Sequence, residues 1–166
     1  MSLKVFVSYS SKDLAWVANL REWLDSIKDL EVDLFVSEYD TPSGASLIDT
    51  VKSHIDQADV VLVVLSSNSA QSIWVQQEIG YANGVYRTRG KPVTIPIVIE
   101  GGVLPDGMIQ GVRAVDVSRD TEVASRQLYE ALERLKVEAA NRRGLLVLGG
   151  IILGLAIVNR QKQQDL

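Results

Sequence analysis

A tryptophan and a carboxylate lie four residues apart in the chain, at Trp74 and Glu78, shortly after the apolar run 60–65. If this segment is helical, the two side chains share one face of the helix, one turn apart. A helix that follows a buried parallel strand begins at the carboxyl edge of the sheet, where α/β proteins bind their ligands. A carboxylate there can stabilise a developing positive charge. A lone glutamate on a helix is also commonly a solvated surface residue. Whether Glu78 is functional or solvated therefore depends on the elements around it.

The lack of cysteine and the single histidine limit the kinds of catalytic and metal sites that the chain can form. It has no cysteine and a single histidine, His54. This excludes disulfides, thiol nucleophiles and the usual zinc sites, and we predict no metal site. A serine–histidine pair would have to use His54, which falls within an expected helix without an evident acidic residue to orient it. We therefore expect His54 to be a surface or helix-end residue.

Five short apolar runs predict the strands of a sheet, and segments with helical spacing of apolar residues separate them. The expected strands are residues 4–8, 32–36, 60–65, 92–99 and 112–117. Strand and helix alternate with no sign of a repeat or a second domain. This predicts an α/β fold with a five-stranded parallel sheet in the flavodoxin-like, doubly wound order 2-1-3-4-5. The crevice then lies beyond the first and third strands, close to Glu78.

Three local features of this sheet are also predicted. Either Ser11 or Asp13 is expected to cap the helix that follows the first strand. Pro96 donates no ladder hydrogen bond, which favours an outer place for the fourth strand. The run 112–117 is expected to form a weaker strand than the other four.

The charge of the chain is unevenly distributed. Of its 166 residues, 46% are hydrophobic and 23% charged, as is normal for a globular protein, and the formal net charge is -4. Residues 134–166 hold six basic and two acidic residues, so this end carries +4 and the remainder -8. An acidic body gives no broad attraction to nucleic acid, and we predict none as a partner. A basic end beside apolar residues suits a membrane surface instead.

The apolar run 144–158 contains no charged residue and is flanked by arginines on both sides. As a helix it would extend roughly 22 Å, against roughly 30 Å for the hydrocarbon core of a bilayer, and flanking arginines can recover part of the difference. We expect a membrane-spanning helix, with an interfacial or partner-covered helix and a sheet-packed segment as the alternatives. The predicted division is a domain at 1–138, a basic linker at 139–143, the membrane helix at 144–158 and a polar tail at 159–166.

Three motifs, in order, resemble those of the Toll/interleukin-1 receptor (TIR) domain family over about residues 4–135. The run Phe6-Val7-Ser8-Tyr9-Ser10, followed by Asp13, is similar to the family's first box. The stretch 40–46, with Pro42 and Gly44, looks like its second-strand loop. The run 63–66, followed by Ser72, Trp74 and Glu78, resembles its third strand and catalytic helix. One departure is Ser37, where many relatives carry an aspartate. Phospho-receiver domains and flavodoxins fit less well, because their clustered acids or glycine-containing phosphate loop are missing.

The resemblance implies a function as well as a fold. Some TIR domains cleave NAD+ with a glutamate placed as Glu78 is, which implies an NAD+ glycohydrolase or cyclase acting in signalling, innate immunity or antiphage defence. Glu78 would be catalytic and NAD+ the substrate, with no further cofactor. The residues expected to contact the substrate are Phe6, Ser8, Tyr9, Trp74, Pro42 and Gly44. The resemblance also implies TIR–TIR association, with the domain in the cytoplasm and anchored to a membrane through 144–158. The alternatives are a non-enzymatic TIR adaptor and a membrane effector that perturbs the bilayer.

Overall fold

The structure is a computed structural model that describes residues 2–36, 46–101, 109 and 111–164, with the backbone alone for 146–164. Two of the residues expected to contact substrate, Pro42 and Gly44, lie outside the described residues, as does Ser37. The predictions made for these three positions therefore stay predictions.

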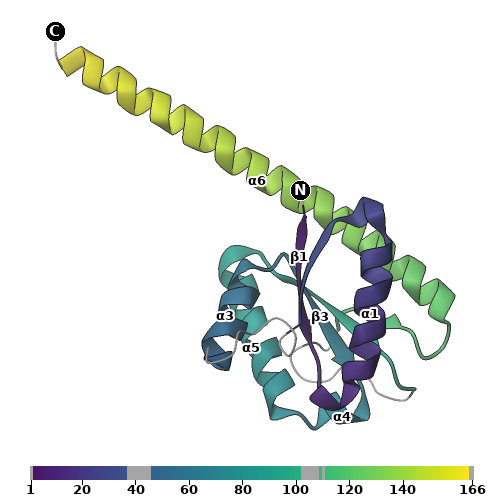
Figure 1. Cartoon of the computed structure of the whole chain (residues 1–166). Helices are drawn as coiled ribbons and strands as arrows, with labels where there is room; N and C mark the ends of the chain where they lie inside the picture. The colour runs from purple at the N-terminus through teal and green to yellow at the C-terminus, as the bar shows by residue number, and fades with distance from the viewer. Residues whose placement is uncertain (1, 37–45, 102–108, 110, 165–166) are drawn as a thin grey trace.

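The sheet has the predicted strands in the predicted order. The strands are β1 (Leu3–Ser8), β2 (Val32–Val36), β3 (Val60–Leu65), β4 (Val93–Val98) and β5 (Val115–Asp116). They pair in parallel in the order β2-β1-β3-β4-β5 (Figure 1). All six residues of β3 are buried, which accounts for the unbroken apolar run, because a central parallel strand is covered on both faces. The fifth strand is the short one, as expected.

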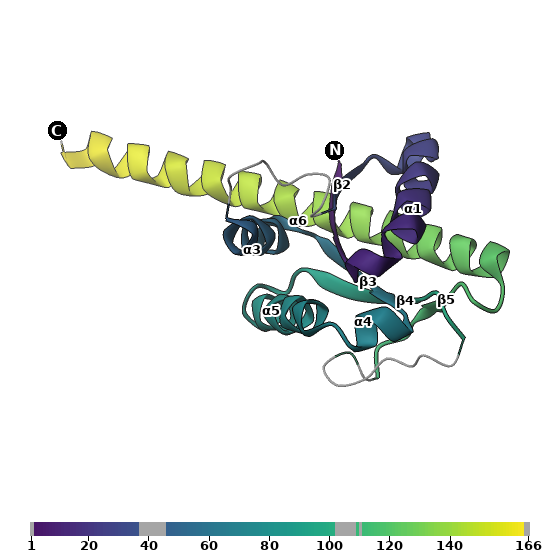
Figure 2. The same cartoon turned by 60° about the horizontal axis from the view of Figure 1, so that its bottom comes forward.

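Helices cover both faces of the sheet (Figures 1 and 2). They are α1 (Leu14–Ser26), α3 (Leu47–Gln57), α4 (Ser67–Ala70), α5 (Ile73–Arg89) and α6 (Thr121–Gln164), with short 3-10 turns η1 (Ser11–Asp13) and η2 (Lys28–Leu30). On one face, Leu24 of α1 and Leu132 of α6 join the core. On the other face, Ile55 of α3 and Ile79 of α5 do so. The pair α3 and α5 therefore forms the layer that contains Glu78.

Pro96 lies on β4, which is one strand in from the edge of the sheet. The amide groups of Val93 and Ile99 donate toward the β3 side, and the carbonyl of Val98 accepts from Val117 on the β5 side. Because the direction alternates along a strand, the nitrogen of Pro96 faces the β5 side. β5 begins to pair only at Ile97, so the missing donor leaves no gap in a ladder.

The last helix, α6, runs without a break from Thr121 to Gln164, through the predicted linker at 139–143. Its first half packs on the sheet, and its second half projects beyond the body of the domain (Figure 1). Among the described residues, no helix is both long enough and apolar enough to cross a membrane. The membrane helix predicted at 144–158 stays a prediction.

A buried aspartate ties α6 to the amino edge of the sheet. Asp59, 7% exposed, accepts a hydrogen bond from the backbone amide of Lys4 at 3.1 Å. Its carboxylate also pairs with Lys91 at 3.5 Å and with Arg143 of α6. A second tie joins Lys136 to Glu31 at 3.5 Å. These contacts fix the direction in which α6 leaves the domain.

Replacing Asp59 by Asn should lower the free energy of unfolding by about 3 kcal/mol, because two cations would lose a buried partner. Urea unfolding of the two proteins measures the difference. Glu122→Gln is the control, since it removes an exposed acid paired with Arg126 on the surface of α6. Equal and small losses in the two variants would contradict the role given to Asp59.

Candidate functional site

The helix that holds Glu78 is positioned by the end of β3 and by caps at both ends. Ser66 follows β3 and caps α4 in a capping box with Ser69. The hydroxyl of Ser72 then accepts the amide of Val75 at 3.3 Å and caps α5. Gly90 ends α5 with a φ of 68°, which glycine adopts without strain. Glu78 thus lies in the second turn of a helix whose start is fixed at the carboxyl edge of the sheet.

Glu78 is buried and hydrogen-bonded across the sheet to β1. Its side chain is 5% exposed, and the hydroxyl of Ser8, itself fully buried, donates to Glu78 Oε2 at 2.6 Å. Trp74 lies one turn earlier on the same helix, is half-buried, and also donates a side-chain hydrogen bond to this carboxyl group. The predicted neighbours Ser8, Trp74 and Glu78 therefore meet in one place, and the solvated-surface reading of Glu78 is wrong.

Burial raises the pKa of Glu78 from its ordinary value of 4.5 to about 7. The cause is desolvation of the charged form, which the hydrogen bonds from Ser8 and Trp74 offset only in part. Near neutral pH this carboxyl group therefore exchanges between its acid and its ionised form. Such a poised group inside a cleft is typical of catalytic sites.

Glu78 opens into a cavity of about 470 Å³ between α3 and α5. From α3, the wall is made by one helical face, namely Ile48, Val51, Lys52 and Ile55. From α5, it is made by Trp74, Gln77, Glu78 and Tyr81. The cavity is thus largely apolar, with the carboxyl group of Glu78, the ammonium of Lys52 and the indole of Trp74 as its distinctive groups. This is the composition expected of a small-molecule site.

Two other residues expected to contact a ligand lie in the core. Phe6 is 1% exposed, and its ring stacks on Phe35 at 5.7 Å. Tyr9 is 6% exposed and packs with Val17 of α1. Side chains alternate along a strand, so Phe6 and Ser8 face α3 and α5 while Tyr9 faces α1. Both rings are buried and neither lines the cavity beside Glu78, so the contact of Phe6 and Tyr9 with a substrate stays a prediction.

A buried polar network beside the site was not expected from the sequence. Asp13 is 8% exposed and accepts hydrogen bonds from the hydroxyl of Ser66 at 2.6 Å and from the amide of Asn68 at 2.7 Å. Asp13 stands at the N-cap position of α1, as predicted, but its side chain makes no capping hydrogen bond to that helix. Neither does Ser11, which lies within η1 and not at the cap of α1. Asp13 instead ties the β1–α1 connection to the end of β3.

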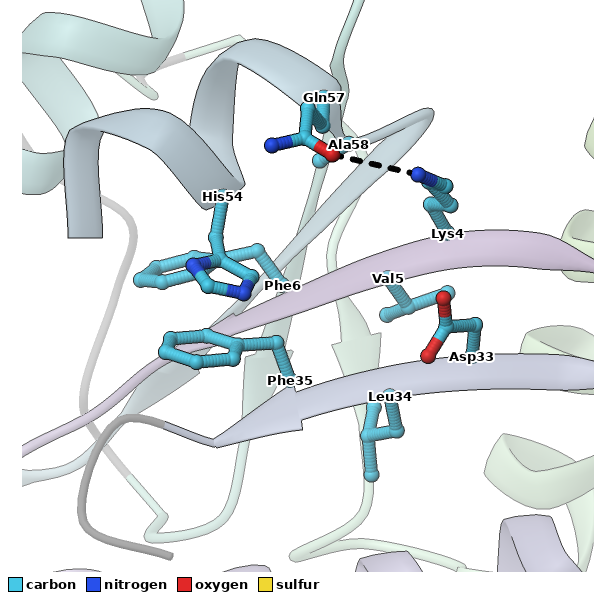
Figure 3. A pocket seen from close by; sticks show the side chains of 9 residues that line it. All are labelled: Lys4, Val5, Phe6, Asp33, Leu34, Phe35, His54, Gln57 and Ala58. Carbon is cyan, nitrogen blue, oxygen red and sulfur yellow. Dashed lines mark hydrogen bonds between the residues drawn. The ribbon is translucent and has the colours of Figure 1, made fainter. Parts of the chain in front are cut away.

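The single histidine belongs to a different hollow, of about 280 Å³, beside β2 (Figure 3). His54 lies in the last turn of α3, as predicted for a helix-end residue, and its ring stacks on Phe35 at 3.5 Å. The rings of Phe6 and His54 both stack on the ring of Phe35 (Figure 3). The sequence carried no signal for this contact, because Phe35 lies on another element. Among the described residues, no three acidic or histidine side chains gather as a metal site requires.

Removing the hydroxyl of Ser8 should raise the pKa of Glu78 above 7, because this hydrogen bond favours the ionised form. A ¹³C NMR titration of the glutamate carboxyl groups in wild type and Ser8→Ala measures the change. Ser10→Ala is the control, since the side chains that hydrogen-bond to Glu78 are those of Ser8 and Trp74. An unchanged pKa in Ser8→Ala would show that the hydroxyl does not hold the carboxylate.

The raised pKa of Glu78 also makes stability depend on pH. The folded protein holds this proton more tightly than the unfolded chain, so stability is full below about pH 4.5 and falls as pH rises to about 7. Over this range the wild type should lose up to about 3 kcal/mol relative to Glu78→Gln, which does not titrate. Denaturant unfolding of both proteins from pH 4 to 8 gives the difference, and parallel pH profiles would contradict the burial of an ionisable Glu78.

Known proteins share this architecture. The family model described as "TIR domain" matches residues 5–136. Over 83 residues, 50% of this chain, the sequence is 28% identical to Toll-like receptor 6 of Bos taurus and covers 10% of that protein. The chain thus spans about a tenth of the length of the curated relatives it matches.

Two solved structures are similar in fold. The TIR domain of a Toll-related receptor of Hydra magnipapillata has a TM-score of 0.65 at 16% identity, with coverage of 80% of this chain and 99% of that chain. A prokaryotic SEFIR domain has a TM-score of 0.58 at 21% identity, with coverage of 81% and 98%. The match of the family model over most of the chain, on a sheet with this strand order, establishes that the protein belongs to the TIR domain family.

Proposed function

We propose that this TIR domain cleaves the bond between nicotinamide and ribose in NAD+, as a glycohydrolase or a cyclase. The observation that carries the proposal is the buried carboxyl group of Glu78, hydrogen-bonded to Ser8 and open to a cavity large enough for a ribose and a ring. A buried acid with a pKa near 7 has a cost in stability, which a purely structural role on a helix surface would not need.

The reaction suits a single carboxylate. The nicotinamide ring of NAD+ is cationic, so when the bond from ribose C1′ to the ring nitrogen breaks, its electron pair neutralises the ring and no acid is needed. The ribose becomes an oxocarbenium-like cation. An ionised Glu78 stabilises this cation because it would lie close to it in a site that holds little water. Water, or a nucleophilic atom within the same substrate, then bonds to C1′, and any proton released passes to Glu78 or to solvent. The products are nicotinamide with ADP-ribose or its cyclic form.

The neighbours of Glu78 have separate tasks in this scheme. Ser8 holds one carboxylate oxygen and stabilises the ionised form. The indole of Trp74 forms part of the cavity wall beside Glu78, where it limits the access of water and offers a flat apolar surface to a ring. Asp13 and Ser66 act at a distance by keeping the ends of β1 and β3 together.

The wider setting of the enzyme is part of the same proposal. Association of TIR domains would bring the heads of several chains together, and residues 144–158 would anchor them to a membrane with the domain in the cytoplasm, where NAD+ is available. Cleavage of NAD+ would then serve a signalling or defence response. The long helix α6, which projects from the body of the domain, is a suitable connection between head and anchor (Figure 1).

A non-enzymatic adaptor is the second candidate function. It is favoured by apolar side chains exposed at the starts of α3 and α5, with Ile48 52% and Ile73 75% exposed, which would suit contacts between domains. An adaptor of this kind would release no nicotinamide at any protein density.

Glu78→Gln should abolish the release of nicotinamide, by 100-fold or more as an order-of-magnitude expectation, because the cation would lose its carboxylate. The full chain, wild type and variant, is incubated with NAD+ in solution and crowded on lipid vesicles, and the products are resolved by chromatography. Circular dichroism checks that the variant is folded. Release by the variant at the wild-type rate, or no release by a crowded wild type, would end the proposal.

The rate should follow the ionisation of Glu78. Since only the ionised form stabilises the cation, kcat/KM for NAD+ should rise with pH and level off above about 7. In Ser8→Ala the rise of kcat/KM should move to higher pH, because loss of the hydrogen bond from Ser8 raises the pKa of Glu78. A rate that is flat between pH 5 and 8, measured with a buffer series at constant ionic strength, would assign the chemistry to another group.

A further inference from the structure

A cationic side chain lines the same cavity as Glu78. Lys52 is the one cationic side chain that the structure places on its wall, within the described residues. It lies on the face of α3 that is turned toward α5, one residue after the buried Val51. Its ammonium lies 5.8 Å from the centroid of the Tyr81 ring on α5, so it reaches across the cavity mouth toward the other helix.

The Tyr81 ring that contacts this ammonium is held in place by a hydrogen bond of its hydroxyl group. The hydroxyl of Tyr81 donates to Asp56 Oδ1 at 3.2 Å, and Asp56 is also paired with Arg89 at 3.5 Å. Asp56 thus has two partners of its own, and Lys52, an exposed side chain on the cavity wall, lies over the face of the Tyr81 ring. Tyr81 follows Glu78 by three residues, so the ring over which the ammonium lies is about one turn along α5 from Glu78.

We propose that Lys52 binds the diphosphate of the dinucleotide substrate and makes the site selective for a nucleotide diphosphate over a simple riboside. This rests on the proposed cleavage of NAD+. A diphosphate carries two negative charges, and it must enter an acidic domain beside a carboxylate that is at least partly ionised. The cationic side chain of Lys52, over the ring of Tyr81, offsets this repulsion. The site would then have two ends, with Glu78 acting on the ribose at one end and Lys52 holding the phosphates at the other. An ammonium suits this task, since it binds phosphate as a point charge.

The test uses the full chain with Lys52→Gln, Lys52→Arg and, as a control, Lys28→Gln. Lys28 is exposed on η2, so its replacement removes the same charge away from the cavity. Calorimetry measures the binding of ADP-ribose, which needs no catalysis, and nicotinamide release gives kcat and KM for NAD+. Thermal unfolding verifies that the variants are folded.

Lys52→Gln should weaken ADP-ribose binding and raise KM for NAD+ by about tenfold each, with kcat changed less than about threefold, because a bound diphosphate contributes to affinity more than to the chemical step. Lys52→Arg should keep both values within about threefold, and Lys28→Gln should match the wild type. A merely structural lysine would not give this split between KM and kcat.

The outcomes separate this inference from the proposed function. If the wild type releases nicotinamide but ADP-ribose binds Lys52→Gln as tightly as the wild type, the role of Lys52 is wrong and the cleavage of NAD+ stands. If the wild type releases none but binds ADP-ribose in a manner that depends on Lys52, the phosphate site stands and the enzyme proposal fails. Failure of the wild type to bind ADP-ribose would overturn the role of Lys52.

Discussion

The hydrogen bond from Ser8 to Glu78, at 2.6 Å between two buried side chains, is the interaction on which the site depends. It joins residues 70 positions apart in the sequence, so it exists only when β1 and β3 are neighbours and α5 begins at their carboxyl edge. The strand order, the caps of α5 and the network of Asp13 and Ser66 all serve this one arrangement. The result is a carboxyl group that is held in place and can ionise near neutral pH.

In the proposed function, this arrangement places stability and chemistry in opposition. All six residues of β3 are apolar and buried, and a buried acid beside this strand raises the free energy of the folded state whenever that acid is ionised. The hydrogen bonds from Ser8 and Trp74 reduce this cost without removing it. Such a compromise is typical of functional sites, where local rules of stability are broken for a reason. The proposed role would explain why Glu78 is buried although glutamate is usually found on exposed helix faces.

Much of the fold followed from the sequence because it depends on periodicity. The unbroken apolar run of β3 and the alternation of strands and helices were sufficient for the order of the sheet. The spacing of Trp74 and Glu78 was sufficient to place the two side chains together on one wall of a cavity. Contacts between distant elements were not predictable. Asp13 resembled a helix cap, yet it binds Ser66 across the sheet. Tyr9 was predicted to contact the substrate, but its side chain packs with Val17 of α1, on the face of the sheet opposite to Glu78. His54 stacks on Phe35 through tertiary packing alone.

The central claim is that the carboxylate of Glu78 faces the charged end of NAD+. The most direct test is a ¹³C NMR titration of Glu78 in the free protein and with carba-NAD+, an analogue whose ring is cationic but whose bond to the sugar does not break. We expect a pKa of about 7 for Glu78 in the free protein and a lower pKa in the complex, because a nearby cation favours the ionised form. A pKa near the ordinary 4.5 in the free protein, or no change when the analogue binds, would contradict this claim.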